Sequence, residues 1–436
     1  MTVPRSTTRV VVLALAMVLS FVGLALSTGV TATAGIALPK VVSANPANYT
    51  PQLPKGSYAT EALRQIDRTD TMYAGGTFTT LGGQPRSNIG AFSATTGALT
   101  SFAPQIDGTV WALEDLGAGR LAVGGDFTTV NGVARRGLAV VDATTGVVDP
   151  AFNAHLTGRV TSLNLVNGRL IAGGAFTKKL EAVDPGTGAD TGYLNLNISG
   201  SYVYRTAVSP DGTHLVSVAN INSVSGQARR QAFMVDLGPT SGTLSSWYYK
   251  PLLKQCEATA YNFYLRDVDF SPDGSYFVLD GTGFVSQSGD LGVTICDAAA
   301  RFETANLSPN RPTWINYTGG DTLHSVAVSS TAVYVAGHQR WLDNTTGRDS
   351  CAPGCVSRPG IGAIDPTTGK ALTWDPRRTR GIGAKELILT LAGLWVGSDT
   401  RDGIQLGCSS PGGPNLDDCA GKPLENHGGI GFLPLS

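Results

Sequence analysis

Residues that could bind a ligand gather in one short segment, from position 338 to 349. Its chemically capable side chains are His338, Arg340, Trp341, Asp343, Arg348 and Asp349. A guanidinium can form paired hydrogen bonds with a carboxylate, and an indole ring offers a flat apolar face to a sugar. The segment therefore predicts a binding site for carboxylates or sugar hydroxyls.

Oxygen-bearing residues in the same segment raise the question of calcium. Residues 343–349 read DNTTGRD, which spaces oxygen ligands along a loop but lacks the D-x-[DN]-x-[DN]-G-x5-E pattern of an EF-hand. The prediction is therefore no metal and no cofactor, with calcium in this loop as the weaker alternative.

A second candidate cluster is aromatic. The stretch WYYKPLLKQCEATAYNFY contributes Trp247, Tyr248, Tyr249, Tyr261, Phe263 and Tyr264. Aromatic side chains in an exposed loop can stack on a glycan or anchor a protein partner. They can equally cover the edge of a sheet or wedge between neighbouring units, and we favour this packing role for the second cluster.

Familiar catalytic motifs are missing from the sequence. It has no G-x-S-x-G, no H-E-x-x-H, no P-loop and no G-x-G-x-x-G between a strand and a helix, and its five histidines are scattered. An acid pair such as Asp267 and Glu386 remains conceivable if both lie in strands that line a common axis.

The six cysteines are an even number, which in an exported chain favours disulfides. Loop closure favours Cys351 with Cys355, Cys408 with Cys419 and Cys256 with Cys296, although fifteen pairings are open in principle. A structural zinc site is disfavoured because the spacings do not match C-x2-C pairs.

The N-terminal segment has the features of a secretory signal peptide. Arg5 and Arg9 precede an apolar run from Val10 to Leu26, and small residues follow up to Ala34. We expect residues 1–34 to be removed, residues 35–47 to form a linker and residues 48–436 to form one domain. A retained membrane anchor is the alternative, since the run approaches the roughly 20 residues that span a bilayer.

Net charge argues against nucleic acid as a partner. The whole chain carries a formal charge of -1, and removal of the two N-terminal arginines makes it -3. No basic face is evident, and the sign is wrong for phosphate binding. We expect a secreted protein, extracellular or cell-wall associated, without a stable membrane span after cleavage.

A repeat explains how these residues are positioned. The stretch MYAGGTFTTLGGQPRSNIGAFSATTG recurs 49 residues later as LAVGGDFTTVNGVARRGLAVVDATTG, and degenerate copies bring the total to seven. Each copy has four short runs of alternating apolar residues joined by tight turns, and no convincing helix. Four-stranded units repeated radially make a β-propeller, so the predicted fold is all-β, with seven four-stranded blades.

The two ends of the chain are predicted to meet. The last copy stops after its third strand, while NYTPQL from Asn48 resembles the fourth-strand stretch SFAPQI from Ser101. We therefore expect Asn48–Gln52 to pair with the strand at Ile430–Leu433 and complete the last blade, which removes a free edge.

These repeats resemble those of secreted bacterial β-propellers of the delta-60 type, which are often domains of uncharacterised exported proteins. The resemblance is closest over residues 72–190 and weaker over 325–400. It implies a seven-bladed fold and export, and it carries no reaction or ligand that could be transferred to positions here.

Two kinds of polar residue recur with the repeat. Aspartates close the third strand at Asp142, Asp184, Asp236 and Asp365, and arginines precede it at Arg86, Arg135, Arg136, Arg229, Arg230 and Arg358. The aspartates suit an acidic ring or turn caps, and the arginines suit an anion site or a repeated structural contact. We favour the structural role for both.

The long insertions all fall on one predicted face, and five of the six cysteines lie in them. Cross-linked loops on a rigid scaffold are typical binding sites. The sequence therefore favours a noncatalytic binding or scaffold module for a glycan or protein ligand. A secreted hydrolase or lyase with an axial site and a structural cell-envelope protein are the alternatives.

Overall fold

The computed structural model describes residues 1–2, 35–67, 69–258, 263–284, 291–378, 383–400 and 427–435. These residues form an all-β structure, as predicted, with no α-helix and one short 3-10 helix, η1 (Lys250–Leu253). The predicted signal peptide lies almost wholly outside the described residues, and Cys408 and Cys419 also lie outside them.

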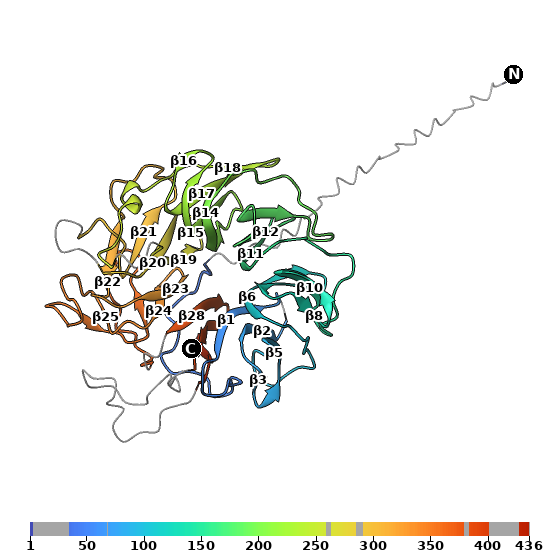
Figure 1. Cartoon of the computed structure of the whole chain (residues 1–436), viewed down its shortest axis with the longest axis horizontal. Coiled ribbons are helices and arrows are strands. Elements are labelled where there is room, and N and C mark those ends of the chain that lie inside the picture. Colours follow the sequence, from blue (N-terminus) through green and yellow to red (C-terminus); the bar gives the residue numbers. More distant parts are fainter. Residues whose placement is uncertain are drawn as a thin grey trace.

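The strands form seven sheets of three or more strands, which Figure 1 shows arranged around a common centre. Within each sheet, neighbouring strands along the chain pair antiparallel. The first sheet contains β1 (Ala59–Gln65), β2 (Thr71–Thr77) and β5 (Ile89–Ser93). The second contains β6 (Thr109–Gly117), β7 (Arg120–Asp126) and β10 (Leu138–Asp142). The third contains β11 (Val160–Val166), β12 (Arg169–Gly174) and β13 (Leu180–Val183).

The middle two sheets are the largest. They are β14 (Ser199–Val208), β15 (His214–Val224), β17 (Gln231–Leu237) and β18 (Gly242–Leu244), with β16 (Gln227–Ala228) beside β15; and β19 (Leu265–Phe270), β20 (Tyr276–Gly281), β21 (Ala298–Glu303) and β22 (Trp314–Tyr317). The last two sheets are β23 (Leu323–Val328), β24 (Val333–Gly337) and β27 (Ile361–Ile364); β28 (Ala384–Thr390), β29 (Gly393–Ser398) and β30 (Ile430–Pro434).

Three two-stranded hairpins extend from the sheets. They are β3 (Thr80–Leu81) with β4 (Gln84–Pro85), β8 (Thr129–Val130) with β9 (Val133–Ala134), and β25 (Trp341–Leu342) with β26 (Val356–Ser357).

The first strand of each sheet contacts the first strand of the next sheet, and β28 contacts β1. These inner strands therefore follow one another around the centre of Figure 1. Hydrophobic clusters lie between consecutive sheets; one, for example, joins Tyr73 of β2 to Val110 of β6 and Val123 of β7. Because apolar side chains cover both faces of each sheet, the strands are buried almost along their whole length.

The predicted fourth strand is much weaker than expected in four sheets. There it is reduced to one isolated bridge, such as Val141 with Val148 or Ile364 with Ala371. Within the part of the chain that the structure describes, a regular fourth strand occurs only in the sheets that contain β18 and β22.

The double glycine of the repeat is explained by close approach of two strands. A Cβ at Gly75 would lie 2.4 Å from Cγ1 of Val110 in the next sheet. A Cβ at Gly76 would lie 2.0 Å from the backbone oxygen of Ala59 in the paired strand. Only glycine fits both positions, so the repeat retains it where the inner strand crosses its partner.

The N-terminal segment lies along the last sheet, although it forms no regular ladder there. Backbone N–H groups of Ser43, Ala47 and Leu53 donate to the oxygens of Pro434, Phe432 and Gly428 at 2.7, 2.8 and 2.7 Å. Thr50 Oγ1 donates to Ile430 O at 2.9 Å. Residues 43–53 therefore run antiparallel along the outer edge of β30.

The prediction of a linker at residues 35–47 is corrected by the structure. Leu38 and Val42 are 1% and 2% exposed and belong to the hydrophobic cluster between the last two sheets. Val42 N also donates to Tyr334 Oη at 3.0 Å. Ile36, Val41 and Ala44 pack against the same cluster, so apolar side chains along the segment fix it in the core.

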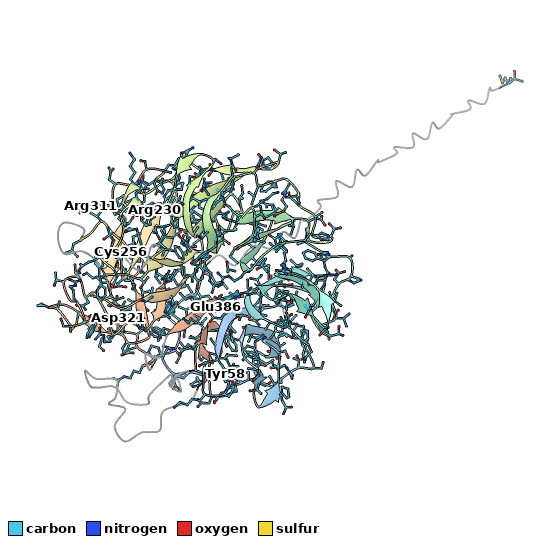
Figure 2. The ribbon with its side chains drawn as sticks, in the orientation of Figure 1. Tyr58, Arg230, Cys256, Arg311, Asp321 and Glu386 are labelled. Atoms are coloured by element: carbon cyan, nitrogen blue, oxygen red, sulfur yellow. A yellow bond between two sulfur atoms is a disulfide. The ribbon has the colours of Figure 1, made fainter. Side chains whose placement is uncertain are left out.

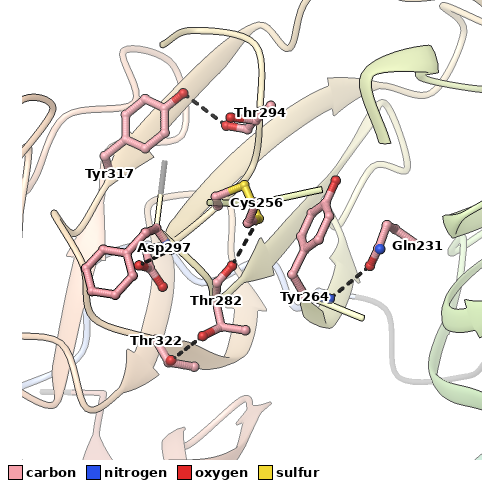
Figure 3. Close-up of a disulfide and its surroundings, with 10 residues drawn as sticks. Gln231, Cys256, Tyr264, Thr282, Thr294, Asp297, Tyr317 and Thr322 are labelled. Atoms are coloured by element: carbon pink, nitrogen blue, oxygen red, sulfur yellow. Dashed lines mark hydrogen bonds between the residues drawn. A yellow bond between two sulfur atoms is a disulfide. The ribbon is translucent and has the colours of Figure 1, made fainter. Parts of the chain in front are cut away.

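Both predicted disulfides within the described residues are confirmed. Cys256 pairs with Cys296, and Cys351 pairs with Cys355. Figure 3 shows the first bridge beside Thr282 at the end of β20, close to the Thr282 to Thr322 hydroxyl contact. These two bridges are compatible with an extracellular protein.

Candidate functional site

A bulge at the same position in every inner strand creates the candidate site. In β1 the pairing passes from Thr60 with Gly76 to Ala62 with Gly75, so that Glu61 is the extra residue. Equivalent register shifts occur in the other six inner strands. The extra residues, which we call the axial ring, are Glu61, Trp111, Thr161, Tyr204, Arg266, His324 and Lys385. In β19 both Arg266 and Asp267 lie between the paired residues Leu265 and Val268, opposite Asp280 of β20.

Contacts across the centre show that the axial ring is a local assembly. Arg205, directly after Tyr204, donates from Nη2 to the backbone oxygens of Glu61 and Lys385 at 3.2 and 3.4 Å. The same guanidinium forms an ion pair with Glu386 at 2.8 Å. Arg205 therefore reaches from β14 across to β1 and β28.

Three aromatic side chains lie in or beside the axial ring. The rings of Tyr202, Tyr204 and Phe263 lie with centroids 5.6 to 6.3 Å apart. The guanidinium of Arg159 lies 5.8 Å from the centroids of both Trp111 and Tyr202. Aromatic and charged groups from five sheets thus meet at one end of the axis.

Arg205 and the inner strands line a cavity of about 590 Å³. It extends to the turns after β1 and β28, at the end of the axis opposite the bulges, where Gly35 and Ile36 also line it. Its lining holds five acidic side chains, Asp67, Glu114, Asp267, Asp269 and Glu386, against two basic ones, Arg64 and Arg205. Figure 2 shows Glu386 near the centre of the molecule.

The two acids named as a conceivable axial pair, Asp267 and Glu386, both line this cavity. Their oxygens are already engaged: Asp267 Oδ2 accepts from Ser325 Oγ and from Val326 N, both at 3.0 Å. Asp269 Oδ2 likewise accepts from Val328 N at 2.7 Å. These carboxyls tie β19 to β23, and Arg205 ties Glu386 to β14.

Burial disfavours the charged forms of the cavity acids. Desolvation raises the pKa of Glu386 to about 8, against the opposing effect of Arg205, and neighbouring Asp267 and Glu61 raise it further. Desolvation raises the pKa of Glu114 to about 7, against the opposing effect of Arg64. The pKa of Asp269 is raised well above its usual range, mainly by desolvation.

We therefore expect stability to fall as the pH rises. A carboxyl whose pKa is higher in the folded chain stabilises it fully below about pH 4.5, and this contribution is lost as the pH rises through 7 and 8. The free energy of unfolding should drop by ~3 kcal/mol between mildly acidic and mildly basic solution. Urea unfolding at several pH values measures it, and Glu386→Gln should flatten the profile; a stability that rises with pH would contradict the assignment.

Strand pairing places the long loops at the end of the axial ring. The end of β24 pairs with the start of β23, and the end of β20 pairs with the start of β19. The loop with Cys351–Cys355 and the segment with Cys256 therefore leave the sheets beside the bulges. An ion pair links the loop to this segment, since Arg348 Nη2 lies 2.5 Å from Glu257 Oε1.

Most residues of the predicted loop site are engaged in structural contacts. Arg340 donates from Nε to Asp321 Oδ2 at 2.8 Å and from Nη2 to Asp349 Oδ1 at 2.7 Å, and it stacks 4.2 Å from the Trp341 ring centroid. Asp343 accepts from Asn316 Nδ2 at 2.7 Å and from Ala371 N at 3.1 Å.

His338 is the predicted residue that the structure brings to the axis. Its ring centroid lies 6.2 Å from that of His324, a member of the axial ring. No group of three or more His, Cys, Asp or Glu that could hold a metal ion occurs among the described residues.

Three residues of the predicted aromatic cluster, Trp247, Tyr248 and Tyr249, have the packing role. Phe263 lies instead beside Tyr202 and Tyr204, and Tyr261 lies outside the described residues. Trp247 and Tyr249 are fully buried and Tyr248 is 8% exposed, in a core with Phe277 and Phe302. Tyr249 Oη donates to Val293 O at 2.5 Å, and Tyr248 Oη accepts from Arg230 N at 3.0 Å. No ring face is left for a ligand, so these three residues are removed from the candidate binding set.

The recurring polar residues also have structural roles. Asp142 Oδ1 accepts from the N–H groups of Thr144 and Thr145 at 3.0 and 2.7 Å, and Asp184 and Asp365 do the same in their turns. Arg86, Arg135 and Arg358 donate to the carbonyl of the preceding residue and to one in the weak fourth strand. Asp236 differs, because it contacts His214 Nδ1 at 3.1 Å.

Comparisons with known proteins address the fold alone. The sequence matches no family model and no curated protein. A solved structure described as RRP9 WD40 repeats is 11% identical, with a TM-score of 0.53 over 90% of this chain and 99% of that chain. A computationally designed protein, Ika8, is 14% identical, with a TM-score of 0.46 over 81% of this chain and 85% of that one. The first likeness shows a fold similar to a WD40 propeller.

Among the described residues, no helix is long and apolar enough to cross a membrane.

Proposed function

We propose that this chain is an exported, noncatalytic binding module: a seven-bladed β-propeller whose last blade is completed by residues 43–53. Its ligand is a glycan that binds at the axial ring, on the end that carries the long disulfide-bearing loops. The seven sheets, the cyclic contacts of their inner strands and the WD40 likeness support the propeller. The signal-like N-terminus and the two disulfides support export.

The observation that carries the proposal is the repeated bulge. Bulges re-aim a side chain, and they are common at barrel rims and beside functional sites. Here each inner strand contributes one at the same level, and the residue types differ from sheet to sheet. A purely structural repeat would use one residue type, as the turn aspartates do. Indole, phenol, imidazole and charged groups around one axis suit a polar ligand with apolar faces, such as a sugar.

Hydrolysis or lysis at the axis is the second candidate, and the presence of Asp267 and Glu386 in one cavity favours it. Their hydrogen bonds argue for binding instead, because a general base or nucleophile needs an available oxygen. Incubation of the protein with each bound glycan, followed by product analysis, separates the two: new reducing ends or unsaturated products would establish the enzyme.

A glycan array together with a cell-wall-fraction pulldown tests the proposal. The wild-type protein should bind, and Trp111→Ala should weaken binding by about tenfold or more, because stacking on an aromatic ring is lost. Trp341→Ala, in the loop hairpin beside Arg340, is the matched control and should change it little. If only Trp341→Ala loses binding, the site lies in the loop and not at the axial ring. Capture of a protein instead of a glycan would change the ligand class. Absence of binding to any glycan or cell-wall fraction would defeat the proposal.

A further inference from the structure

We infer that the axial ring selects glycans that carry carboxylate groups, an inference that rests on the proposed function and names its ligand class. The inference depends on the charge at the ring and on the surroundings of one guanidinium, that of Arg159.

Positive charge predominates at the level of the ring. Arg266 and Lys385 belong to it and Arg159 lies beside it, whereas Glu61 is the one acidic member. A fourth cation, Arg205, lies directly beneath and donates to the backbone of Glu61 and of Lys385. Asp267 and Glu386 also directly follow ring residues, but burial raises the pKa of both carboxyls and so favours their neutral forms. A carboxylate that enters from the loop end meets cations first.

Arg159 is held in the way a carboxylate receptor requires. Its guanidinium lies between the rings of Trp111 and Tyr202, 5.8 Å from each centroid. Within the described part of the chain it forms no ion pair and its side chain donates no hydrogen bond. A guanidinium that is fixed by aromatic faces keeps its donor edge for a planar acceptor, which suits two parallel hydrogen bonds to a carboxylate.

Matched ligands give the sharpest test. Oligogalacturonate, alginate oligomers and hyaluronan oligomers are compared with their methyl esters, which keep the sugar and remove the charge. Calorimetry with the purified full-length protein should show about tenfold tighter binding of at least one acid form, and this preference should shrink as salt rises.

Variants assign the effect to the ring. Arg159→Gln should reduce the preference for the acid form toward one, and Arg159→Lys should restore it only in part, because a lysine cannot form the paired contact. Exposed Arg136→Gln is the control, and thermal unfolding checks that each variant folds. Equal binding of acid and ester, or a preference that survives Arg159→Gln, would overturn the inference while leaving the proposed function intact. Absence of binding to every glycan of the array would instead defeat the proposed function and this inference together.

Discussion

Replacement of Gly76 by alanine is expected to lower the free energy of unfolding by about 3 kcal/mol or more. The new Cβ would lie 2.0 Å from Ala59 O and 3.0 Å from Thr60 Cα, both backbone atoms of the bulged inner strand. Neither atom belongs to a flexible side chain, so the strand itself must shift. Because Glu61 follows directly, the same change should also disturb the axial ring and weaken glycan binding.

Equilibrium unfolding in urea measures the loss at Gly76. Gly186→Ala is the control, since the nearest atom to its Cβ is a side-chain oxygen of Asp184 at 3.3 Å and its backbone conformation is ordinary. The control should change the stability by less than about 1 kcal/mol. Similar losses at both positions would show that close approach to the inner strand is not the reason for the double glycine.

Substitution of Arg205 by methionine should have the second largest effect, a loss of about 3 kcal/mol or more at mildly basic pH. Its guanidinium is the cation 2.8 Å from Glu386, and both side chains are largely buried, at 13% and 16% exposed. Removal leaves Glu386 and neighbouring Asp267 without this cation in the cavity. The loss should shrink in mildly acidic solution, where these carboxyls bind protons.

The double variant Arg205→Met, Glu386→Gln isolates this interaction. It should recover part of the stability that the single variant loses, because no unpaired carboxylate remains at that position. Exposed Arg136→Met controls for the substitution itself. A loss at Arg205 that is independent of pH, with no recovery in the double variant, would show that packing of the side chain and not its charge is important.

The sequence predicted the parts of the fold that depend on local spacing. Gly75–Gly76 and its copies located the second strands, and the closest-spaced cysteines paired as loop closure favours. The weak fourth strands were not predictable, because a run such as Val147–Val148 has the right pattern and too little length. The packed segment at Leu38 and Val42 was also missed, since its partners lie about 290 residues away.

The candidate site was predictable only in part. The acid pair Asp267 and Glu386, named from the sequence only as conceivable, lines the cavity, and the packing role favoured for Trp247 agrees with its burial. Arg340 and Asp343 have side chains suited to a ligand, but they form hydrogen bonds with Asp321 and Asn316 instead. These partners lie 19 and 27 residues away in the sequence, so residue spacing did not reveal them. Three members of the axial ring had a signal that could have been used, because Glu61, Trp111 and Thr161 lie opposite the double glycines of β2, β7 and β12.

The way in which residues 43–53 run along β30 bears on how the chain is made. Ser43 and Ala47 are among the first described residues to be synthesised, and their partners Pro434 and Phe432 are among the last. Contacts of such high sequence separation form slowly and cannot form before residues 428–434 have been synthesised. Until then the sheet edge that these residues cover stays open to wrong partners. The last step in forming this sheet therefore joins two segments that are made far apart in time.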